Sequence, residues 1–239
     1  MWEIVHINET DSTNQWIKRM DGQAKNVRTG IMMVVVAEYQ TAGRGCGTNS
    51  WESERGQNLL CSILLHPHNV PAAKQFHISM AVSVAITDVL GQYIGDVSIK
   101  WPNDIYWRDG KIGGILIEHA LQGNVIRQSI IGVGLNVNQQ QFVSNAPNPV
   151  SLWQICGQET DRETLLNGIL LRFEQLLNDD VRSSYMSRLY RRRGYHPYVD
   201  GSGPFMAQIA DVKDDGRLVL LDDNGAERTF TFKEVQFVI

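Results

Sequence analysis

Hydrophobic positions along the chain follow two different spacings. Two apolar runs, Ile31 to Ala37 and Leu59 to Leu65, are rich in β-branched or aliphatic residues. Runs of this length and composition are typical of strands that are buried on both faces. Between Ala72 and Tyr93 the apolar residues instead recur at helical spacing, which predicts an amphipathic helix packed on a sheet.

A second group of strands is predicted in the middle of the chain, at Val97 to Trp101, Ile112 to Glu118 and Val125 to Val137. The dipeptides Asp109-Gly110 and Gly123-Asn124 separate these strands. Such dipeptides close tight antiparallel hairpins, because glycine and asparagine accept positive φ easily. We therefore expect a meander here and not a chain of βαβ units.

The last third of the chain predicts a helix followed by short strands. Thr160 and Glu163 have the spacing of a capping box, and the helix after them should run, with a break near residues 178–180, to the cluster Arg191 to Arg193. After Gly194, short alternating segments and tight turns suggest a small SH3-like barrel. The expected fold is α+β, with a mixed, mainly antiparallel sheet and packed helices in residues 1–193 and the barrel in residues 194–239.

Composition narrows the class of protein. The 239 residues are 43% hydrophobic and 20% charged with a net charge of −4, which excludes a disordered, collagenous or coiled-coil chain and leaves no overall attraction to nucleic acid. No apolar run is long enough for a membrane helix, and the first residues lack the pattern of a signal peptide, so we expect a cytoplasmic protein. Its three widely spaced cysteines argue against a disulfide framework and a zinc site.

The glycine-rich stretch between the first two strands is the densest candidate for chemistry. Gly43, Gly45 and Gly47 allow backbone N–H groups to approach an anion, and Arg44 adds a charged donor suited to phosphate. The stretch lacks the Gly-Lys-Ser/Thr of a Walker loop. A flexible connection would have the same composition.

Two further candidates lie near the predicted meander. Pro102 should interrupt a strand, so Asn103 and Asp104 are expected in a rigid loop at the strand end, either in a site or in a simple Asx turn. Lys111 is expected at a strand start beside Gly114, where missing side chains leave room for a ligand. A solvated strand end is the alternative for Lys111.

Side-chain amides and hydroxyls provide the remaining candidates. Asn136 and Asn138 fall on the same side of an extended, buried segment, so both amides need partners within the protein or on a ligand. The segment Asp11 to Asn14 fits two interpretations equally well, a helix N-cap and a binding motif.

Taken in order, these motifs resemble those of biotin protein ligases. The motifs are Asp11 to Asn14, Ala37 to Gly45 with Trp51, Lys100-Trp-Pro-Asn-Asp104, Lys111 to Glu118 and Gly132 to Asn138. Each is weak alone, but their order and spacing are specific, and the match covers residues 1–190. The resemblance implies the biotin–lipoate ligase fold, related to that of class II synthetases, with a small end domain.

The resemblance also implies an activity and its partners. Members of this family activate biotin with ATP to biotinyl-5′-AMP, releasing pyrophosphate, and then transfer the biotinyl group to one lysine of a biotin carboxyl carrier protein. Mg²⁺ would accompany the ATP phosphates, with no permanently bound metal. A lipoate or octanoate ligase or transferase of the same fold is the closest alternative, and a non-catalytic biotin-binding module is another.

The family's functional residues map onto this chain by motif. The residues implied in biotin binding are Ser12, Thr13, Asn14, Gln40, Arg44, Gly45, Cys46, Lys111 and Gly114. Those implied in nucleotide binding are Trp51, Asn103 and Asn136. Lys111, Arg44 and Asp104 are the implied catalytic residues, since a carboxylate that attacks a phosphate needs cations nearby and the acceptor lysine needs help to lose its proton.

The chain departs from the family pattern in two places. Many members continue Gly-Arg-Gly with further basic residues, whereas residues 46–50 carry none, so we expect a looser hold on the adenylate. Regulatory members have an N-terminal helix-turn-helix domain of roughly 60 residues, and only ten residues precede Asp11, so DNA binding is not expected. The arginines near residue 191 fit a solvated helix end, and the protein is expected to be a monomer or a weak homodimer.

Overall fold

The computed structural model describes residues 2–21, 30–143 and 147–239. Its larger sheet has seven strands in the order β1-β2-β3-β7-β6-β5-β4. Their bounds are β1 Glu3–Ile7, β2 Gly30–Ala37, β3 Leu59–His66, β4 Val97–Lys100, β5 Asp104–Trp107, β6 Gly110–Gln122 and β7 Val125–Leu135. Only β1 and β2 pair in parallel among these strands, so the predicted mixed, mainly antiparallel sheet is confirmed, as is the meander from β4 to β7.

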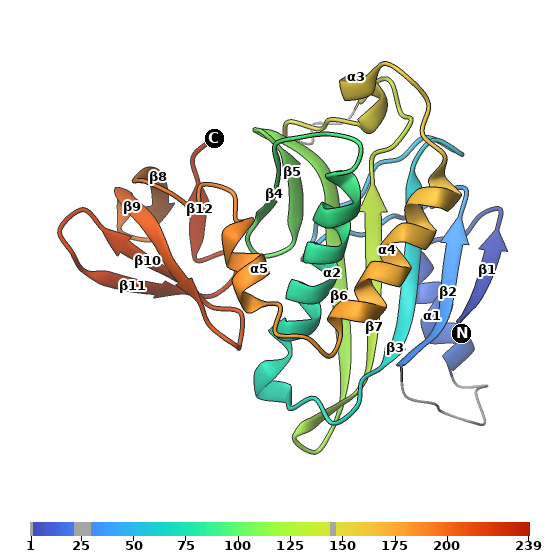
Figure 1. The fold of residues 1–239 in the computed structure, drawn as a ribbon, viewed down its shortest axis with the longest axis horizontal. Coiled ribbons are helices and arrows are strands. Elements are labelled where there is room, and N and C mark those ends of the chain that lie inside the picture. Colours follow the sequence, from blue (N-terminus) through green and yellow to red (C-terminus); the bar gives the residue numbers. More distant parts are fainter. Residues whose placement is uncertain (1, 22–29, 144–146) are drawn as a thin grey trace.

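Helices cover both faces of this sheet. The helices are α1 Thr13–Asp21, α2 Phe76–Leu90, α3 Leu152–Cys156, α4 Arg162–Leu176 and α5 Arg182–Ser187, with a 3₁₀ turn at Ala72–Lys74. Figure 1 shows α2 and α4 crossing one face, and α1 packs against β2, β3 and β7 from the other. In the part of the chain that the structure describes, no helix is long and apolar enough to cross a membrane.

The two faces of the sheet differ because side chains alternate along each strand. On β3, Ile63 belongs to the large core shared with α2 and α4, whereas Leu64 packs with Ile17 of α1 in a small second cluster. The large cluster dominates, and α2 is buried around most of its circumference between the sheet, α4 and α5. The α1 face carries fewer large apolar side chains, which leaves room there for a cavity.

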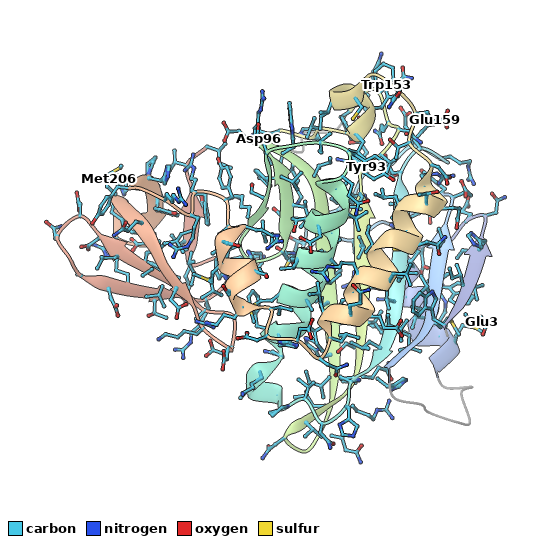
Figure 2. All side chains as sticks on the ribbon, viewed as in Figure 1. Glu3, Tyr93, Asp96, Trp153, Glu159 and Met206 are labelled. Atoms are coloured by element: carbon cyan, nitrogen blue, oxygen red, sulfur yellow. The ribbon has the colours of Figure 1, made fainter. Side chains whose placement is uncertain are left out.

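The C-terminal segment forms a second, antiparallel sheet of five strands. Its order is β11-β10-β9-β8-β12, with bounds β8 His196–Asp200, β9 Gly203–Val212, β10 Leu218–Asp222, β11 Glu227–Phe230 and β12 Val235–Phe237. Figure 1 shows it beside β4 and α5, at the end of the molecule opposite β1. Side chains densely cover both parts, and Met206 and Glu3 mark the two ends in Figure 2.

The second sheet is firmly attached to the first. Trp101 Nε1 donates a 2.8 Å hydrogen bond to the carbonyl oxygen of Gly216, and the Trp101 and Phe232 rings lie 6.4 Å apart in an edge-on arrangement. Buried residues of both sheets belong to one continuous apolar cluster. The β11–β12 turn is therefore held in place next to the β4–β5 turn.

Several sequence predictions of local structure were wrong in detail. Asp104 begins strand β5 instead of lying in a loop, because the chain turns within residues 101–103 and pairs again with β4 at once. The β5–β6 turn residues are Arg108 and Asp109, with Arg108 at φ 49°, so the predicted Asp109-Gly110 turn is shifted by one residue. The Gly123-Asn124 turn is confirmed.

The helix boundaries also needed correction. The side chain of Asp161 accepts from the backbone N–H groups of Glu163 and Thr164, so Asp161 and not Thr160 caps α4. The predicted break near residue 178 is confirmed, but α5 ends at Ser187, before the arginine cluster. The predicted helix from residue 72 starts only at Phe76, after the 3₁₀ turn.

Candidate active site

A cavity of about 410 Å³ lies on the α1 face of the large sheet. It runs from the start of α1, across β3, β7, β6 and the start of β5, to the β11–β12 turn of the second sheet. The predicted site residues that line it are Ser12, Thr13, Asn14, Gln40, Arg44, Gly45, Cys46, Trp51, Asn103, Asp104, Lys111 and Gly114. The structure thus brings together all the predicted site residues except Asn136.

Strand pairing builds the floor of the cavity from two rows of residues. In one row, Ser62 of β3 pairs with Gly132 of β7, which pairs with Leu116 of β6. In the next row, Gly134 pairs with Gly114, and Gly114 pairs with Asp104. Gly132 and Gly134 are two residues apart on β7, as Gly114 and Leu116 are on β6, so the two rows point to the same face of the sheet. The three glycines in these rows leave space for the cavity above the sheet.

One end of the cavity is neutral and densely hydrogen-bonded. Gln40 Oε1 accepts from the backbone N–H of Thr13 at 2.8 Å and from its hydroxyl at 3.1 Å. Ser62 Oγ lies 2.7 Å from Thr13 Oγ1 and 2.6 Å from Asn14 Oδ1. Ser12, Thr13, Asn14 and Ser62 are all buried. These side chains form a fixed set of hydrogen-bonding groups at the start of α1.

Glycine 132 makes this arrangement possible. A Cβ at this position would lie 2.5 Å from Asn14 Oδ1. The Asn14 amide, which also donates to Glu118 Oε2 at 2.9 Å, can therefore lie directly on β7. Burial alone raises the pKa of Glu118, but hydrogen bonds from Lys18 and Asn14 hold that pKa below its usual value. The ionised carboxylate thus helps to fix Asn14.

The other end of the cavity is charged. Lys111 Nζ lies 2.6 Å from Asp104 Oδ1, and both side chains are largely shielded from solvent. Arg44, from the glycine-rich segment, is more exposed and lies 3.8 Å from Glu118. Ion pairs as open as that of Arg44 contribute little to stability, so its guanidinium is available to a ligand.

The glycine-rich segment is an ordered hairpin and not a flexible connection. Arg44 and Ser50 form an antiparallel bridge, Gly45 N donates to Asn49 O at 2.7 Å, and Trp51 N donates to Gly43 O at 2.9 Å. Cys46, near the tip, is half-buried, and burial raises the pKa of its thiol. Of the two interpretations of this segment, the structure favours a shaped loop at the cavity.

Trp51 lies on the sheet at the charged end. A Cβ on Gly134 would lie 2.6 Å from the indole and one on Gly114 would lie 3.2 Å from it, so the ring rests on this glycine pair. Lys111 Nζ is 5.7 Å from the ring centroid. The indole is thus positioned to form a wall beside Lys111.

The asparagine predictions had different outcomes. Asn103 lines the cavity, and its amide donates to Ile115 O at 2.7 Å. Asn138 is committed to structure, because its amide makes a pair of hydrogen bonds with the backbone of Thr160. Asn136 does not line the cavity, and its amide donates to the carbonyl oxygens of Lys111 and Val150. From outside the cavity, Asn136 therefore supports the strand that carries Lys111.

Sequence analysis missed several residues that line the cavity. Lys100 is part of the Lys-Trp-Pro-Asn-Asp motif but was not assigned to the site; it is half-buried, with Nζ 5.2 Å from the rings of Tyr106 and Phe237. Burial lowers the pKa of Lys100. The second sheet contributes Phe232, Lys233, Val235, Gln236 and Phe237. No motif marks this last group, because only folding brings it to the cavity.

The donor set of the cavity does not resemble a resident metal site. Among the described residues, no group of three or more His, Cys, Asp or Glu side chains could hold a metal ion. Asp104 is the one carboxylate that lines the cavity there, and it already pairs with Lys111. A divalent cation would therefore have to bring most of its ligands with it, as Mg²⁺ does when it is bound to nucleotide phosphates.

Several known proteins resemble this chain. The ligase/repressor BirA of Bacillus subtilis is 30% identical over 211 residues, which cover 83% of this chain and 64% of BirA. A biotin–[acetyl-CoA-carboxylase] ligase of Paracoccus denitrificans is 27% identical over 91% of this chain and 90% of its own length. The chain thus spans less than two thirds of BirA but nearly all of the second relative.

Structural similarity agrees with these relatives. The biotin protein ligase from Aquifex aeolicus in complex with biotin and ATP has a TM-score of 0.77 and 24% identity, with 99% of both chains covered. It confirms the predicted fold class, from the large sheet to the small C-terminal one. The model of the biotin/lipoate A/B protein ligase family matches residues 7–136. Because this match spans more than half of the sequence, the chain belongs to the biotin/lipoate A/B protein ligase family.

Proposed function

We propose that the protein is a biotin protein ligase, which activates biotin with ATP to biotinyl-5′-AMP and transfers it to a lysine of a biotin carboxyl carrier protein. The observation that carries this proposal is the division of one cavity into a neutral hydrogen-bonding end and a cationic end. A biotin molecule has the same division, with an uncharged ureido ring at one end and a carboxylate at the other. Relatives named as biotin ligases support the same activity.

The neutral end favours biotin over lipoate. A ureido group has two N–H donors and a carbonyl acceptor, and it needs matching partners when it leaves water. Thr13, Asn14 and Gln40 present hydroxyl and amide groups at this end of the cavity. The dithiolane ring of lipoate has no strong hydrogen-bonding group and would make no hydrogen bonds to these polar groups.

The cationic end fits the first half-reaction. A biotin carboxylate oxygen attacks the α-phosphorus of ATP, the bond from that phosphorus to the bridging oxygen breaks, and pyrophosphate leaves. Two anions must approach each other, so the barrier falls when fixed cations surround the reacting oxygens. Lys111 and Arg44 are the residues proposed for this task, with the backbone N–H groups of the Gly43 to Gly47 segment beside them.

Asp104 is proposed to act in the second half-reaction. The amine of the carrier lysine attacks the acyl carbon of the adenylate, the bond between that carbon and the phosphate oxygen breaks, and AMP leaves. The attacking nitrogen must lose a proton, and Asp104 lines the cavity with a carboxylate that can accept it. Lys111, 2.6 Å away, keeps this carboxylate oriented.

The nucleotide is proposed to bind between Trp51 and Asn103, with Mg²⁺ carried on its phosphates. The Trp51 indole offers a flat surface for the adenine, and Asn103 lies next to the reacting groups. Asn136 would contribute by supporting Lys111, which is an indirect role. The metal would supply charge neutralisation on the departing pyrophosphate.

The proposed domain division follows the function. We assign biotin and ATP binding to residues 1–193 and the small end domain to residues 194–239. The start of β8 at His196 supports this boundary. A carrier domain of a carboxylase is the proposed protein partner, and a reaction that consumes ATP fits a cytoplasmic location.

The proposal is tested by incubating the protein with biotin, Mg·ATP and a biotin carboxyl carrier domain. Mass spectrometry should detect one biotinyl adduct on the carrier, and none when ATP is left out or when the acceptor lysine is replaced. The same reaction with lipoate or octanoate distinguishes the alternative ligase. Faster modification with lipoate than with biotin, or binding of biotin without any adduct, would contradict the proposed function.

A further inference from the structure

The cavity concentrates positive charge in a protein that is negative overall. Its lining contains Arg44, Lys100, Lys111 and Lys233 but one carboxylate, Asp104, among the described residues, although the whole chain has a net charge of −4. Lys111 pairs with Asp104, and Arg44 has a long contact with Glu118. Lys233 has no ion-pair partner in the described part of the chain. Its charge is therefore uncompensated beside the cavity.

Lys233 comes from the second sheet, far from the family's motifs in sequence. It lies in the turn between β11 and β12, which is closed by hydrogen bonds between Thr231 and Glu234. Its φ is +75°, a left-handed conformation that is uncommon for a residue with a side chain and normally favours glycine. A glycine would suit the turn better, so the lysine side chain needs a reason beyond the turn itself.

The ammonium group of Lys233 reaches the tip of the glycine-rich hairpin. A Cβ on Gly47 would collide with Lys233 Nζ, so the ammonium group lies directly against the backbone of Gly47. The positive charge of Lys233 also lowers the pKa of the neighbouring Cys46 thiol, although burial has the larger, opposite effect. Arg44 is the only basic residue between Gly43 and Trp51. Lys233 thus places a second cation at this hairpin from outside it.

We propose that Lys233 is a substrate-contacting residue that binds the phosphates of ATP and of the adenylate against the Gly43 to Trp51 hairpin. This inference rests on the proposed function, because it assigns an anion to the same cavity. The second sheet then takes part in the site directly, and the loss of basic residues at positions 46–50 is offset by a lysine from the β11–β12 turn. A flexible ammonium is suited to a phosphate whose position changes during the reaction.

The test measures the dissociation constant of Mg·ATP by calorimetry for the wild type and four variants. Lys233→Gly should weaken ATP binding by about ten-fold, the loss expected for one charge-assisted contact. Its melting temperature should stay the same or rise, since glycine relieves the left-handed turn. Lys233→Arg should retain ATP affinity to within about three-fold, because the charge is kept.

Two further variants serve as controls. Lys213→Met removes the same charge from the β9–β10 turn, outside the cavity lining, and should leave ATP affinity unchanged. Arg44→Ala should weaken ATP binding and so shows that the assay detects loss of a cation at the hairpin. Biotin affinity should be unchanged in both Lys233 variants.

The outcomes separate this inference from the proposed function. Equal ATP affinity in the wild type and Lys233→Gly, in a protein that makes biotinyl-5′-AMP, would overturn the inference and leave the proposed function intact. A protein that binds ATP in a Lys233-dependent way but makes no adenylate would overturn the proposed function and leave the inference intact. A wild type that does not bind ATP at all would overturn both.

Discussion

The two ends of the cavity are built from the same sheet face but by opposite means. At the neutral end, buried hydroxyls and amides from α1 and β3 satisfy one another through short hydrogen bonds. At the cationic end, Arg44 and Lys233 are exposed, and Lys100 is half-buried near two aromatic rings without an ion pair in the described structure. The hydrogen bonds of one end are complete without a ligand, and at the other end positive charges outnumber negative ones.

This difference indicates what each end contributes. A satisfied, buried network stabilises the fold and presents a fixed shape, so it suits recognition of a neutral ring. Uncompensated cations contribute little to stability or oppose it, but they are ready to neutralise an anion that arrives with the substrate. Substitutions at the neutral end should therefore affect stability and biotin binding, and those at the cationic end should affect phosphate chemistry.

The largest effect is expected for Lys111→Ala. Loss of the ammonium should remove about 3 kcal/mol of transition-state stabilisation and slow adenylate formation roughly 100-fold. The fold should change little, although Asp104 loses its partner. Pyrophosphate release, followed at saturating biotin and Mg·ATP, measures the effect, and the melting temperature checks the fold.

Lys74→Ala is the matched control, because Lys74 is an exposed lysine on the 3₁₀ turn before α2 and does not line the cavity. It should release pyrophosphate at the wild-type rate. A Lys111→Ala protein that is folded and within a few-fold of the wild type would exclude Lys111 from catalysis.

Ser62→Ala should have the next largest effect, and on stability instead of chemistry. Ser62 is fully buried and joins Thr13 to Asn14, so its removal leaves buried polar atoms with fewer partners. We expect the free energy of unfolding to fall by about 2 kcal/mol, with a raised KM for biotin and an unchanged KM for ATP. Urea denaturation and steady-state kinetics measure these quantities.

Ser98→Ala, on edge strand β4, is the control and should change stability by less than about 0.5 kcal/mol. If Ser62→Ala raised the KM for ATP and left that for biotin unchanged, the division of the cavity into two ends would be wrong.

The sequence predicted the long apolar strands better than the short ones. The strands β2 and β3 consist mainly of apolar residues, a pattern that is typical of strands buried on both faces. The short strands β5 and β8 were missed because each lies next to or contains a proline, Pro102 or Pro197, which normally marks an interruption. In both cases the tertiary pairing outweighs the local signal.

The residues of the candidate site were also predicted only in part. Motifs located the residues that share one strand or loop, such as Lys111 and Gly114. They did not distinguish Asn136 from the residues that line the cavity, because a buried amide has the same sequence signal whether its partner is a ligand or the backbone of Lys111. They could not locate Lys233, since its position depends on how the second sheet packs against the first.

Lys100→Met should have a smaller effect than Lys111→Ala and Ser62→Ala, and it should increase stability. Burial lowers the pKa of Lys100 from its ordinary 10.5, so holding the charge opposes folding. Methionine has a similar volume without the charge, and we expect the variant to be more stable at pH 7 by about 1 kcal/mol while making adenylate more slowly.

The lowered pKa of Lys100 also makes the stability of the wild type depend on pH. Between the lowered pKa of Lys100 and 10.5, the unfolded chain binds more protons than the folded one, so wild-type stability rises with pH in this interval. The advantage of Lys100→Met should therefore be full at pH 7 and should shrink above it. A variant that is less stable than the wild type at pH 7 would show that the contacts with Tyr106 and Phe237 outweigh desolvation.

The smallest effect is expected for Cys46→Arg. If the hairpin held the only cations, a second arginine should slow release of biotinyl-5′-AMP by about ten-fold or more, since a charge-assisted hydrogen bond contributes about 1.5 to 3 kcal/mol. Lys233 already places a cation beside Gly47, however, and a new guanidinium there would meet a like charge. We therefore expect only roughly three-fold slower release in the wild-type background and a larger gain in Lys233→Gly.

Stray biotinylation of a bystander such as albumin reports the released adenylate, because a free acyl adenylate modifies lysines without a docked carrier. Lys233→Gly should label albumin most, the double variant Cys46→Arg/Lys233→Gly less, and Cys46→Arg least. Single-turnover release rates should follow the same order. If all four proteins, the wild type included, retained the adenylate equally, backbone N–H groups of the hairpin would hold it, and the cationic end would act only while the anhydride forms.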